Sequence, residues 1–307
     1  MAMSDTEIRW ALEIKRAVRE EIDRGKDSSK NNQEADDCRF RRELSDFEYS
    51  QYALSTKGNL ENALDRIEKM MYFQEEYNII DTVEEGMALL EAFSKLMPWF
   101  LVSVEFAPEF GHFVSVLDYA KLNPKAVDFP ADWRAWLGGF YYLLQLQHSN
   151  LSACRQGMVN ICECEGMGYK NINVDFFYRT WSHLGEFYPH MYKEVSWLHT
   201  PLESNLLYAS FKNIMGEFAS IIQVGCHFSG YDGRIDEMFK VPSEADAKLR
   251  LDVQVESYLR VRYYHQSSFV LPEPTAEQQQ EDEASSMMSS SAESDEDDND
   301  SDGEEMM

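Results

Sequence analysis

Two short apolar stretches, Trp99-Phe-Leu-Val-Ser-Val-Glu-Phe106 and Phe113-Val-Ser-Val-Leu-Asp-Tyr119, decide the fold class of this chain. Both are rich in β-branched and aromatic residues, which favour strands, and Pro108 and Gly111 between them are typical of a turn. They therefore predict two adjacent strands.

Further strand patterns alternate with helical patterns after this pair. We expect strands at 157–162, 195–198 and 221–226, and helices at 130–148, 174–187 and 203–215. Strands that are joined through helices form parallel crossovers. The sequence therefore predicts an α/β fold with a mainly parallel sheet that is covered by helices.

A helical region precedes the sheet. Apolar residues recur at steps of three and four from Ile8 to Ile22, which is typical of an amphipathic helix, and the polar stretch 27–37 is typical of a linker. A second helical pattern follows Asn59, a candidate N-cap, and continues to Tyr77. We expect the first helix to pack on the domain, with a membrane-surface role as the alternative.

The negative charge of the chain is concentrated at its C-terminus. The formal net charge is −27, and residues 272–307 contain fourteen Asp and Glu and no Lys or Arg. Such a segment is too polar and self-repelling to fold alone, so we expect a disordered acidic tail. It either keeps the protein in solution or docks a basic protein, and phosphorylation of Ser294 and Ser301 would deepen its charge. The lack of a basic surplus argues against nucleic acid as a partner.

The cysteines and the apolar runs indicate a compartment. Five cysteines, an odd number without repeated spacing, fit a reducing environment better than a disulfide framework. We find no secretory signal, and the longest apolar run, Ala135 to Leu146, falls short of the roughly 20 residues that a membrane span needs. We therefore predict a soluble, cytoplasmic protein.

Motifs for metal, nucleotide or catalytic chemistry are incomplete. Cys162-Glu-Cys164 has no second pair of ligands with zinc spacing, and Gly166-Met-Gly168 lacks the third glycine of a dinucleotide-binding turn. The histidines lie in no nucleophile signature. We therefore expect no metal, no cofactor and no enzymatic activity.

Five segments resemble those of a known family in kind and in order. The first, Ser50-Gln-Tyr-Ala-Leu-Ser-Thr-Lys-Gly-Asn-Leu-Glu-Asn-Ala63, is similar to an N-terminal stretch of two helices joined by a short turn, with Gln51, Ser55 and Lys57 in place of the usual arginines. Gly111-His-Phe-Val-Ser-Val-Leu-Asp-Tyr-Ala-Lys-Leu-Asn-Pro124 is similar to a Gly-Arg-Pro-Val strand with its Asp-Pro turn, and Gly157-Met-Val-Asn-Ile-Cys-Glu-Cys-Glu-Gly166 to a central strand that ends in an acidic turn. Phe187-Tyr-Pro-His-Met191 is similar to a Tyr-Pro-Glu-Arg helix end, and Trp197-Leu-His-Thr-Pro201 to an Asn-x-Pro turn. Across residues 45–228 the chain resembles the CRAL-TRIO family of lipid-binding proteins.

This resemblance implies a lipid pocket. In the family, the helix after the Pro turn acts as a gate over a deep apolar pocket, and contact with a membrane opens it. By resemblance, the residues that line or close the pocket are Val116, Val159, Ile161, Leu207, Phe211, Met215 and Phe218. The implied function is binding, and transfer between membranes, of a lipid or another small hydrophobic molecule.

The headgroup positions depart from the family pattern. His190 and Ile221 stand where phosphatidylinositol-binding members have Glu and Lys, so a neutral or weakly polar hydrophobe, or another phospholipid, fits better than a phosphoinositide. The alternative function is a non-catalytic interaction scaffold with a vestigial pocket and a tail that docks basic partners. The expected domains are an amphipathic helix with its linker, a helical CRAL-TRIO N-terminal-like region, a lipid-binding domain, a C-terminal extension and the acidic tail, at 1–35, 36–95, 96–228, 229–271 and 272–307.

Overall fold

The computed structural model describes residues 2–30, 39–108, 111–147, 149–184, 192–200, 208–209, 222–224 and 244–272. The chain divides into two compact units, Met1–Val270 and Leu271–Met307. Every helix and strand given below belongs to the first unit.

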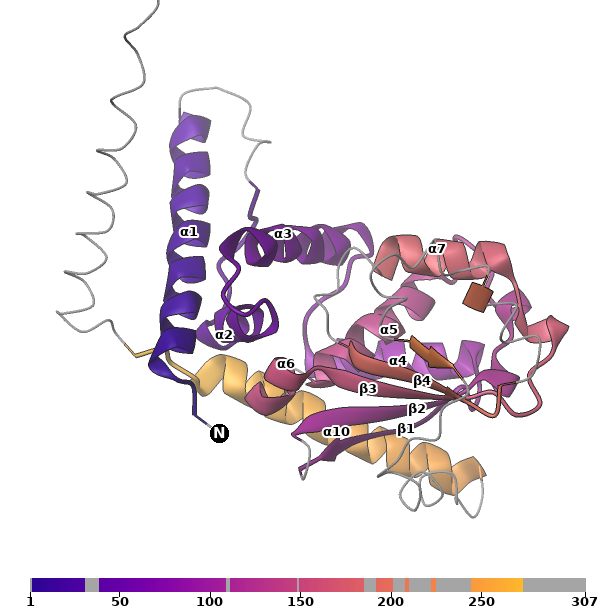
Figure 1. Ribbon diagram of the computed structural model, residues 1–307. Coiled ribbons are helices and arrows are strands. Elements are labelled where there is room, and N and C mark those ends of the chain that lie inside the picture. The colour runs from indigo at the N-terminus through magenta and orange to yellow at the C-terminus, as the bar shows by residue number, and fades with distance from the viewer. Residues whose placement is uncertain are drawn as a thin grey trace, which may run out of the picture. The chain divides into compact units, whose positions relative to one another are not determined.

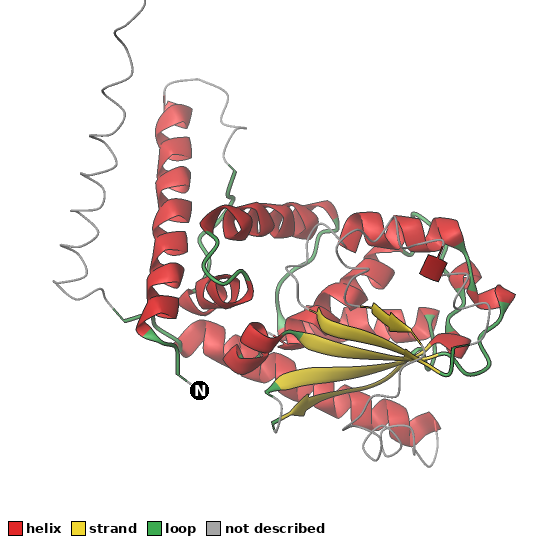
Figure 2. Cartoon of the chain, viewed as in Figure 1, coloured by secondary structure: helices red, strands yellow, loops and turns green. Residues whose placement is uncertain are grey.

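Five strands form one sheet, and their order in space follows their order in the sequence (Figure 1, Figure 2). They are β1 (Leu101–Ala107), β2 (His112–Asp118), β3 (Met158–Glu163), β4 (Tyr192–Leu198) and β5 (Ile222–Val224). β1 and β2 pair antiparallel, whereas β2–β3, β3–β4 and β4–β5 are parallel pairs. The predicted α/β class, with its adjacent strand pair and its mainly parallel sheet, is confirmed.

Four helices precede the sheet. They are α1 (Asp5–Lys30), α2 (Asp46–Ser55), α3 (Leu60–Glu76) and α4 (Val83–Leu96). The predicted N-cap of α3 is confirmed, because the side chain of Asn59 accepts the N–H of Asn62 at 2.9 Å. α2 starts with a capping box in which Ser45 and Glu48 accept each other's backbone N–H groups.

α1 packs on its neighbours through the predicted apolar stripe. Ala11, Ile14 and Val18 are buried, and α1 lies against α2 and α3. Two ion pairs also join α1 to other elements: Glu7 pairs with Arg155, and Lys15 pairs with Asp46. The helix continues to Lys30, into the segment predicted to be a linker. No proline interrupts this stretch, and intrahelical pairs such as Lys26 with Asp23 at 3.0 Å support the extra turns.

The remaining helices lie between the strands or after them in the sequence. They are α5 (Trp133–Gln147), α6 (Leu151–Gln156), α7 (Val174–Leu184), α10 (Glu244–Ser268) and the short 3-10 segments Tyr119–Lys121, Pro124–Ala126 and Tyr169–Asn171. α10 was not predicted, because its apolar residues are spread around the helix and give no stripe. Of the helix predicted at 203–215, only Tyr208 and Ala209 lie within the described residues, and both are helical.

Helices α4 and α5 pack closely because α5 contains two adjacent glycines. A Cβ atom on Gly139 would lie 2.5 Å from Phe93, and one on Gly138 would lie 2.9 Å from Leu89. Next to this contact the ring of Phe93 stacks on that of Trp136, with centroids 5.0 Å apart. Among the described residues, no helix is both long and apolar enough to span a bilayer.

Candidate functional site

Three of the predicted pocket residues lie together in the structure. Val116, Val159 and Ile161 are 1% exposed or less and belong to one apolar cluster. The cluster also contains Ala107, Val114 and Leu198, with Val102 packed at its edge. We call this set the aliphatic face.

Strand pairing explains why these side chains share one face of the sheet. Val116 lies opposite Ile161, and Val114 lies opposite Val159, in the parallel pair β2–β3. Residues two apart in a strand point to the same face. Within the part of the chain that the structure describes, every member of the aliphatic face comes from a strand and none from a helix.

The opposite face of the sheet carries aromatic residues that contact other elements. Phe113 packs edge-on against Tyr258 of α10, with ring centroids 4.8 Å apart. The ring centroids of Trp197 and Tyr119 are 5.8 Å apart, and Tyr119 contacts the ring of Phe100. Phe100 in turn contacts aromatic rings of α4 and α5. The two faces therefore differ: the opposite face carries these aromatic rings and the hydrogen-bonded pair Ser115 and Asn160, whereas the aliphatic face is formed by small aliphatic side chains.

Hydroxyl and carboxylate groups border the aliphatic face. Ser103 donates to Oε1 of Glu105 on β1 at 3.3 Å, and Ser196 donates to Oε1 of Glu194 on β4 at 2.8 Å. The register places Ser103 opposite Val116 and places Ser196 next to β3 on the same face. Because carboxylates are acceptors, this face combines an apolar centre with borders that accept hydrogen bonds.

The predicted gate residues cannot be placed on this face. Leu207, Phe211, Met215 and Phe218 lie outside the described residues, as do the two headgroup positions His190 and Ile221. Their role stays a prediction.

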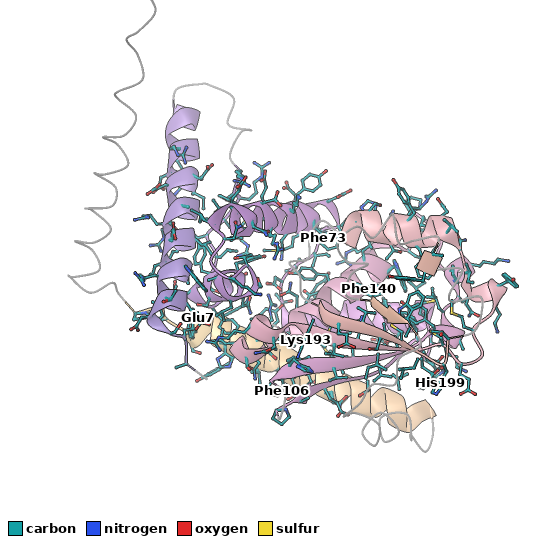
Figure 3. All side chains as sticks on the ribbon, in the orientation of Figure 1. Glu7, Phe73, Phe106, Phe140, Lys193 and His199 are labelled. Atoms are coloured by element: carbon teal, nitrogen blue, oxygen red, sulfur yellow. The ribbon has the colours of Figure 1, made fainter. Side chains whose placement is uncertain are left out.

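A second polar group lies at the carboxyl ends of β3 and β4. Oε2 of Glu163 is 2.8 Å from Nδ1 of His199, and Oε1 of Glu163 accepts the N–H of Glu165 at 2.8 Å. One ligand atom of each of these three residues lies within 4.8 Å of the others, an arrangement that could hold a metal ion. Figure 3 shows His199 at one end of the sheet and Glu7, on α1, at the other side of the molecule.

The electrostatics of this strand-end cluster favour the ion pair within it. The hydrogen bond with Glu163 raises the pKa of His199, and the negative charge of Glu163 adds to the rise. Burial raises the pKa of Asp118 at the end of β2, and the nearby Glu163 raises it further. His199 thus offsets part of the repulsion among these carboxylates.

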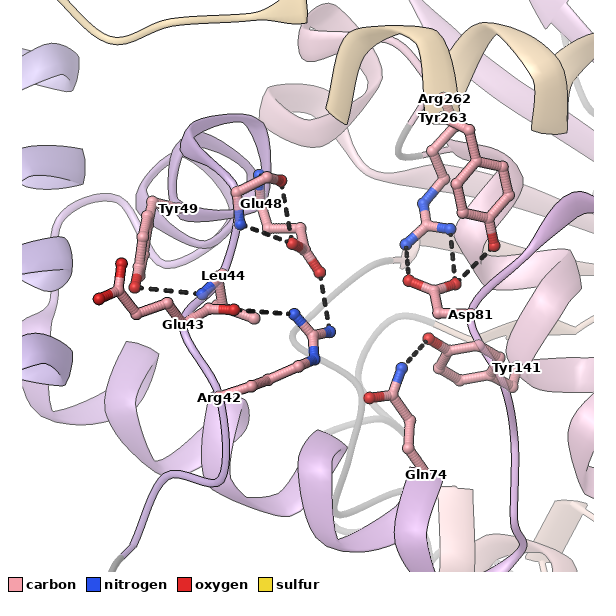
Figure 4. Close-up of polar contacts among 11 residues, drawn as sticks. Arg42, Glu43, Leu44, Glu48, Tyr49, Gln74, Asp81, Tyr141, Arg262 and Tyr263 are labelled. Atoms are coloured by element: carbon pink, nitrogen blue, oxygen red, sulfur yellow. Dashed lines mark hydrogen bonds and ion pairs between the residues drawn. The ribbon is translucent and has the colours of Figure 1, made fainter. Parts of the chain in front are cut away.

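A buried ion pair joins the loop after α3 to α10 (Figure 4). Both terminal nitrogens of Arg262 bind the carboxylate of Asp81, at 2.9 and 3.0 Å, and the Tyr263 hydroxyl donates to the same carboxylate at 2.6 Å. Burial acts to raise the pKa of Asp81, but Arg262 and Tyr263 outweigh it and hold this pKa at about 2. The pair is therefore charged at neutral pH, as buried charges must be when they are well paired.

Further polar groups extend this region toward α2 and α3, as Figure 4 shows. Arg42 donates to Oε1 of Glu48 at 3.1 Å, and Gln74 donates to the hydroxyl of Tyr141 at 2.7 Å. Arg66, on the inner side of α3, is 6% exposed, and its Nη1 is buried without a hydrogen-bond partner. The helices thus enclose several charges in an otherwise apolar region.

The three described thiols lie in the core. Cys162 lies in β3 and Cys164 in the turn after it, as expected, and both are buried, as is Cys154. Burial raises the pKa of Cys154 to about 12 and that of Cys162 well above its ordinary value. Protonated, buried thiols are poor nucleophiles and poor metal ligands.

Comparisons with known proteins find a likeness among solved structures but none among sequences. No family model and no curated protein matches the chain. The solved structure described as the crystal structure of Sfh5 is similar to it with a TM-score of 0.48 and 12% sequence identity, over 73% of this chain and 82% of that chain. The fold class stated above therefore rests on this chain's own strand order and pairing.

Several polar residues were missed by sequence reasoning. Arg66 gave a signal, because it occupies the inner stripe of α3 with Ala63 and Ile67. The signal for His199 was weaker. This residue follows the end of β4, and Glu163 is the last residue of the neighbouring parallel strand β3, so the two lie at the same edge of the sheet. Asp81 and Arg262 gave none, since they are 181 residues apart in the sequence.

Proposed function

We propose that this chain binds a lipid or another small hydrophobic molecule against the aliphatic face of its sheet, without covalent chemistry. The observation that carries the proposal is the composition of that face. Its centre consists of Val, Ile, Ala and Leu side chains from β1 to β4. A lipid chain gains about 0.8 kcal/mol for each methylene group that leaves water, so such a surface suits an alkyl chain or a fused ring.

The sequence between β4 and β5 supplies the proposed cover. Parallel neighbouring strands need a connection that returns along one face of the sheet. The predicted gate residues Leu207, Phe211, Met215 and Phe218 all lie in this connection. The resemblance to CRAL-TRIO proteins supports a gate here, which would open during transient contact with a membrane.

The borders of the aliphatic face favour a ligand that donates hydrogen bonds. Glu105 on β1 and Glu194 on β4 are acceptors, and each already holds a serine hydroxyl. An anionic headgroup would be repelled by these carboxylates, whereas a hydroxyl group would not. We therefore favour a neutral hydrophobe with a hydroxyl group, such as a sterol, over a fatty acid.

Native mass spectrometry of the full chain, followed by lipid extraction, tests the proposal. We expect a bound hydrophobic molecule that Phe211→Asp abolishes, because a buried charge opposes an apolar ligand. Tyr178→Asp, a matched change at an exposed aromatic residue of α7, should leave binding intact. A wild-type protein without extractable or exchangeable hydrophobic molecule would refute the proposal.

A second variant separates a ligand surface from an ordinary core. Val159→Phe enlarges a side chain at the centre of the aliphatic face. If a ligand occupies this face, the larger ring should displace it with little loss of stability. If the face is a closed core, the same change should cost about 1–3 kcal/mol of unfolding free energy through overpacking and leave any bound molecule in place.

A further inference from the structure

Arg66 is a buried cation without a partner. It lies on α3, is 6% exposed, and its Nη1 is fully enclosed. Within the described residues it makes no hydrogen bond and no ion pair. Asp65, its neighbour in the sequence, pairs instead with Lys69 at 3.1 Å. Burial lowers the pKa of Arg66 to about 10, so the guanidinium is still charged at neutral pH.

The other arginines of this region are paired. Arg262 binds Asp81 through two nitrogens, and Arg42 binds Glu48. Arg42 is exposed to solvent, whereas Arg66 and Arg262 are buried. Of these two buried guanidinium groups, Arg262 has a carboxylate partner and Arg66 has none among the described residues. A buried charge is costly unless it is paired and hydrogen-bonded. An unpaired buried cation is unexpected in a chain with a formal net charge of −27, and it points to a negative partner from outside the chain.

A second unused donor lies beside Arg66. Tyr52, on α2, is 8% exposed, and its hydroxyl has no hydrogen bond within the described part of the chain. Tyr52 acts electrostatically on Arg66, and Arg42 and Arg262 act on Tyr52. The two unused donors thus come from adjacent helices and share one electrostatic environment.

We propose that Arg66 and Tyr52 form a binding site for the anionic group of a small molecule, a phosphate or a carboxylate. A guanidinium presents several N–H donors in one plane, which match two oxygens of such a group, and a tyrosine hydroxyl supplies a further donor. Charge-assisted bonds of this kind compensate for the cost of the buried cation.

This site is separate from the aliphatic face. Arg66 and Tyr52 belong to the helical region before the sheet, whereas the aliphatic face belongs to β1–β4. The anion site can therefore exist whether or not the proposed hydrophobic ligand does.

Isothermal titration of the full chain at constant ionic strength tests the site. The probes are inorganic phosphate, dodecyl phosphate and dodecanoate, with sodium chloride as the control salt. We expect Arg66→Met to weaken binding of the phosphate or carboxylate probe by about tenfold or more, the effect of losing charge-assisted hydrogen bonds. Arg260→Met, which removes an exposed arginine of α10, should change the same affinity less than about twofold.

The stability of the variants separates a ligand site from a structural role. If Arg66 serves a ligand, Arg66→Met should unfold at the same denaturant concentration as the wild type or at a higher one, because it removes an unpaired buried charge. Tyr52→Phe should also weaken anion binding, with an unchanged unfolding midpoint. A strongly destabilised Arg66→Met, with Tyr52→Phe binding as the wild type does, would overturn the proposal.

The probes also identify the source of the anion. Binding of inorganic phosphate that depends on Arg66 indicates a free phosphate or a soluble phosphate ester. Binding of dodecyl phosphate or dodecanoate alone, with the same dependence, indicates the head of an amphiphile. Affinities that are equal in wild type and Arg66→Met for all three probes would show that no such site exists. Lipid retention in the Phe211→Asp experiment should not change in Arg66→Met, so the two proposals fail independently.

Discussion

Asp81 and Arg262 show how much one buried pair can matter at the scale of single residues. Arg262 is 1% exposed, and Asp81 together with Tyr263 surrounds its guanidinium. Removing one partner of a buried ion pair leaves the other charge uncompensated, which is far more costly than losing an exposed pair. The pair also ties α10, near the end of the first unit, to the loop after α3.

We predict that Asp81→Asn lowers the unfolding free energy by about 3–5 kcal/mol, measured by urea denaturation near pH 7. Glu256→Gln, which breaks the exposed pair with Arg260, should cost about 0.5 kcal/mol or less. The pKa of Asp81 falls from 3.8 to about 2 on folding, so its contribution is complete above about pH 4 and is lost as pH falls toward 2. The difference between wild type and Asp81→Asn should therefore shrink over this range. A difference that stays constant would contradict this account of the pair.

At the scale of elements, the contact between α4 and α5 depends on two positions without side chains. Gly138 and Gly139 interrupt the longest apolar run of the sequence, and the structure shows the reason. The rings and branches of Phe93 and Leu89 occupy the space that a Cβ atom would need. This close approach lets Phe93 stack on Trp136 and joins the two helices.

We predict that Gly139→Ala lowers the unfolding free energy by about 1–3 kcal/mol, because the added methyl group overlaps Phe93 and forces the helices apart. The urea midpoint should fall while the slope of the transition stays the same. Gly168→Ala is the matched control, since no atom lies within 4 Å of the Cβ it would add and its φ of −146° suits any residue. That variant should stay within about 0.5 kcal/mol of the wild type.

At the scale of the whole molecule, the main division of the chain is the one between its body and its acidic C-terminal segment. Residues 272–307 carry fourteen acidic residues and no basic one, and the chain divides into compact units at Leu271. A polyanionic segment of this kind interacts with cations over a distance set by ionic strength. The prediction that the tail docks a basic protein therefore implies binding that weakens with salt.

We predict that a chain truncated after Pro272 unfolds at the same urea concentration as the full chain but is no longer retained on immobilised poly-lysine at low salt. Loss of like-charged residues that do not build the core should leave its contacts unchanged. The full chain should elute from poly-lysine as sodium chloride rises. Equal retention of both chains would show that the body, and not the tail, carries the interaction.

Local patterns in the sequence determined the strands, the cap at Asn59 and the amphipathic stripe of α1. Each of these depends on residues that are near neighbours along the chain, so their spacing carries the information. Val116, Val159 and Ile161 were named as pocket residues by resemblance to the CRAL-TRIO family, and strand alternation explains why the structure places them on one face of the sheet. Their role in binding a ligand stays a prediction.

Only the tertiary structure decided the partners of the buried charges. Arg262 binds Asp81, which is 181 residues away in the sequence, and His199 binds Glu163, which is 36 residues away. Local periodicity carries no information about pairs with such sequence separations. Burial too depends on what packs from elsewhere, so the sequence could show Arg66 on the inner side of a helix but not that it lacks a partner. α10 was missed for a related reason, because a helix without an apolar stripe is recognised only by its contacts.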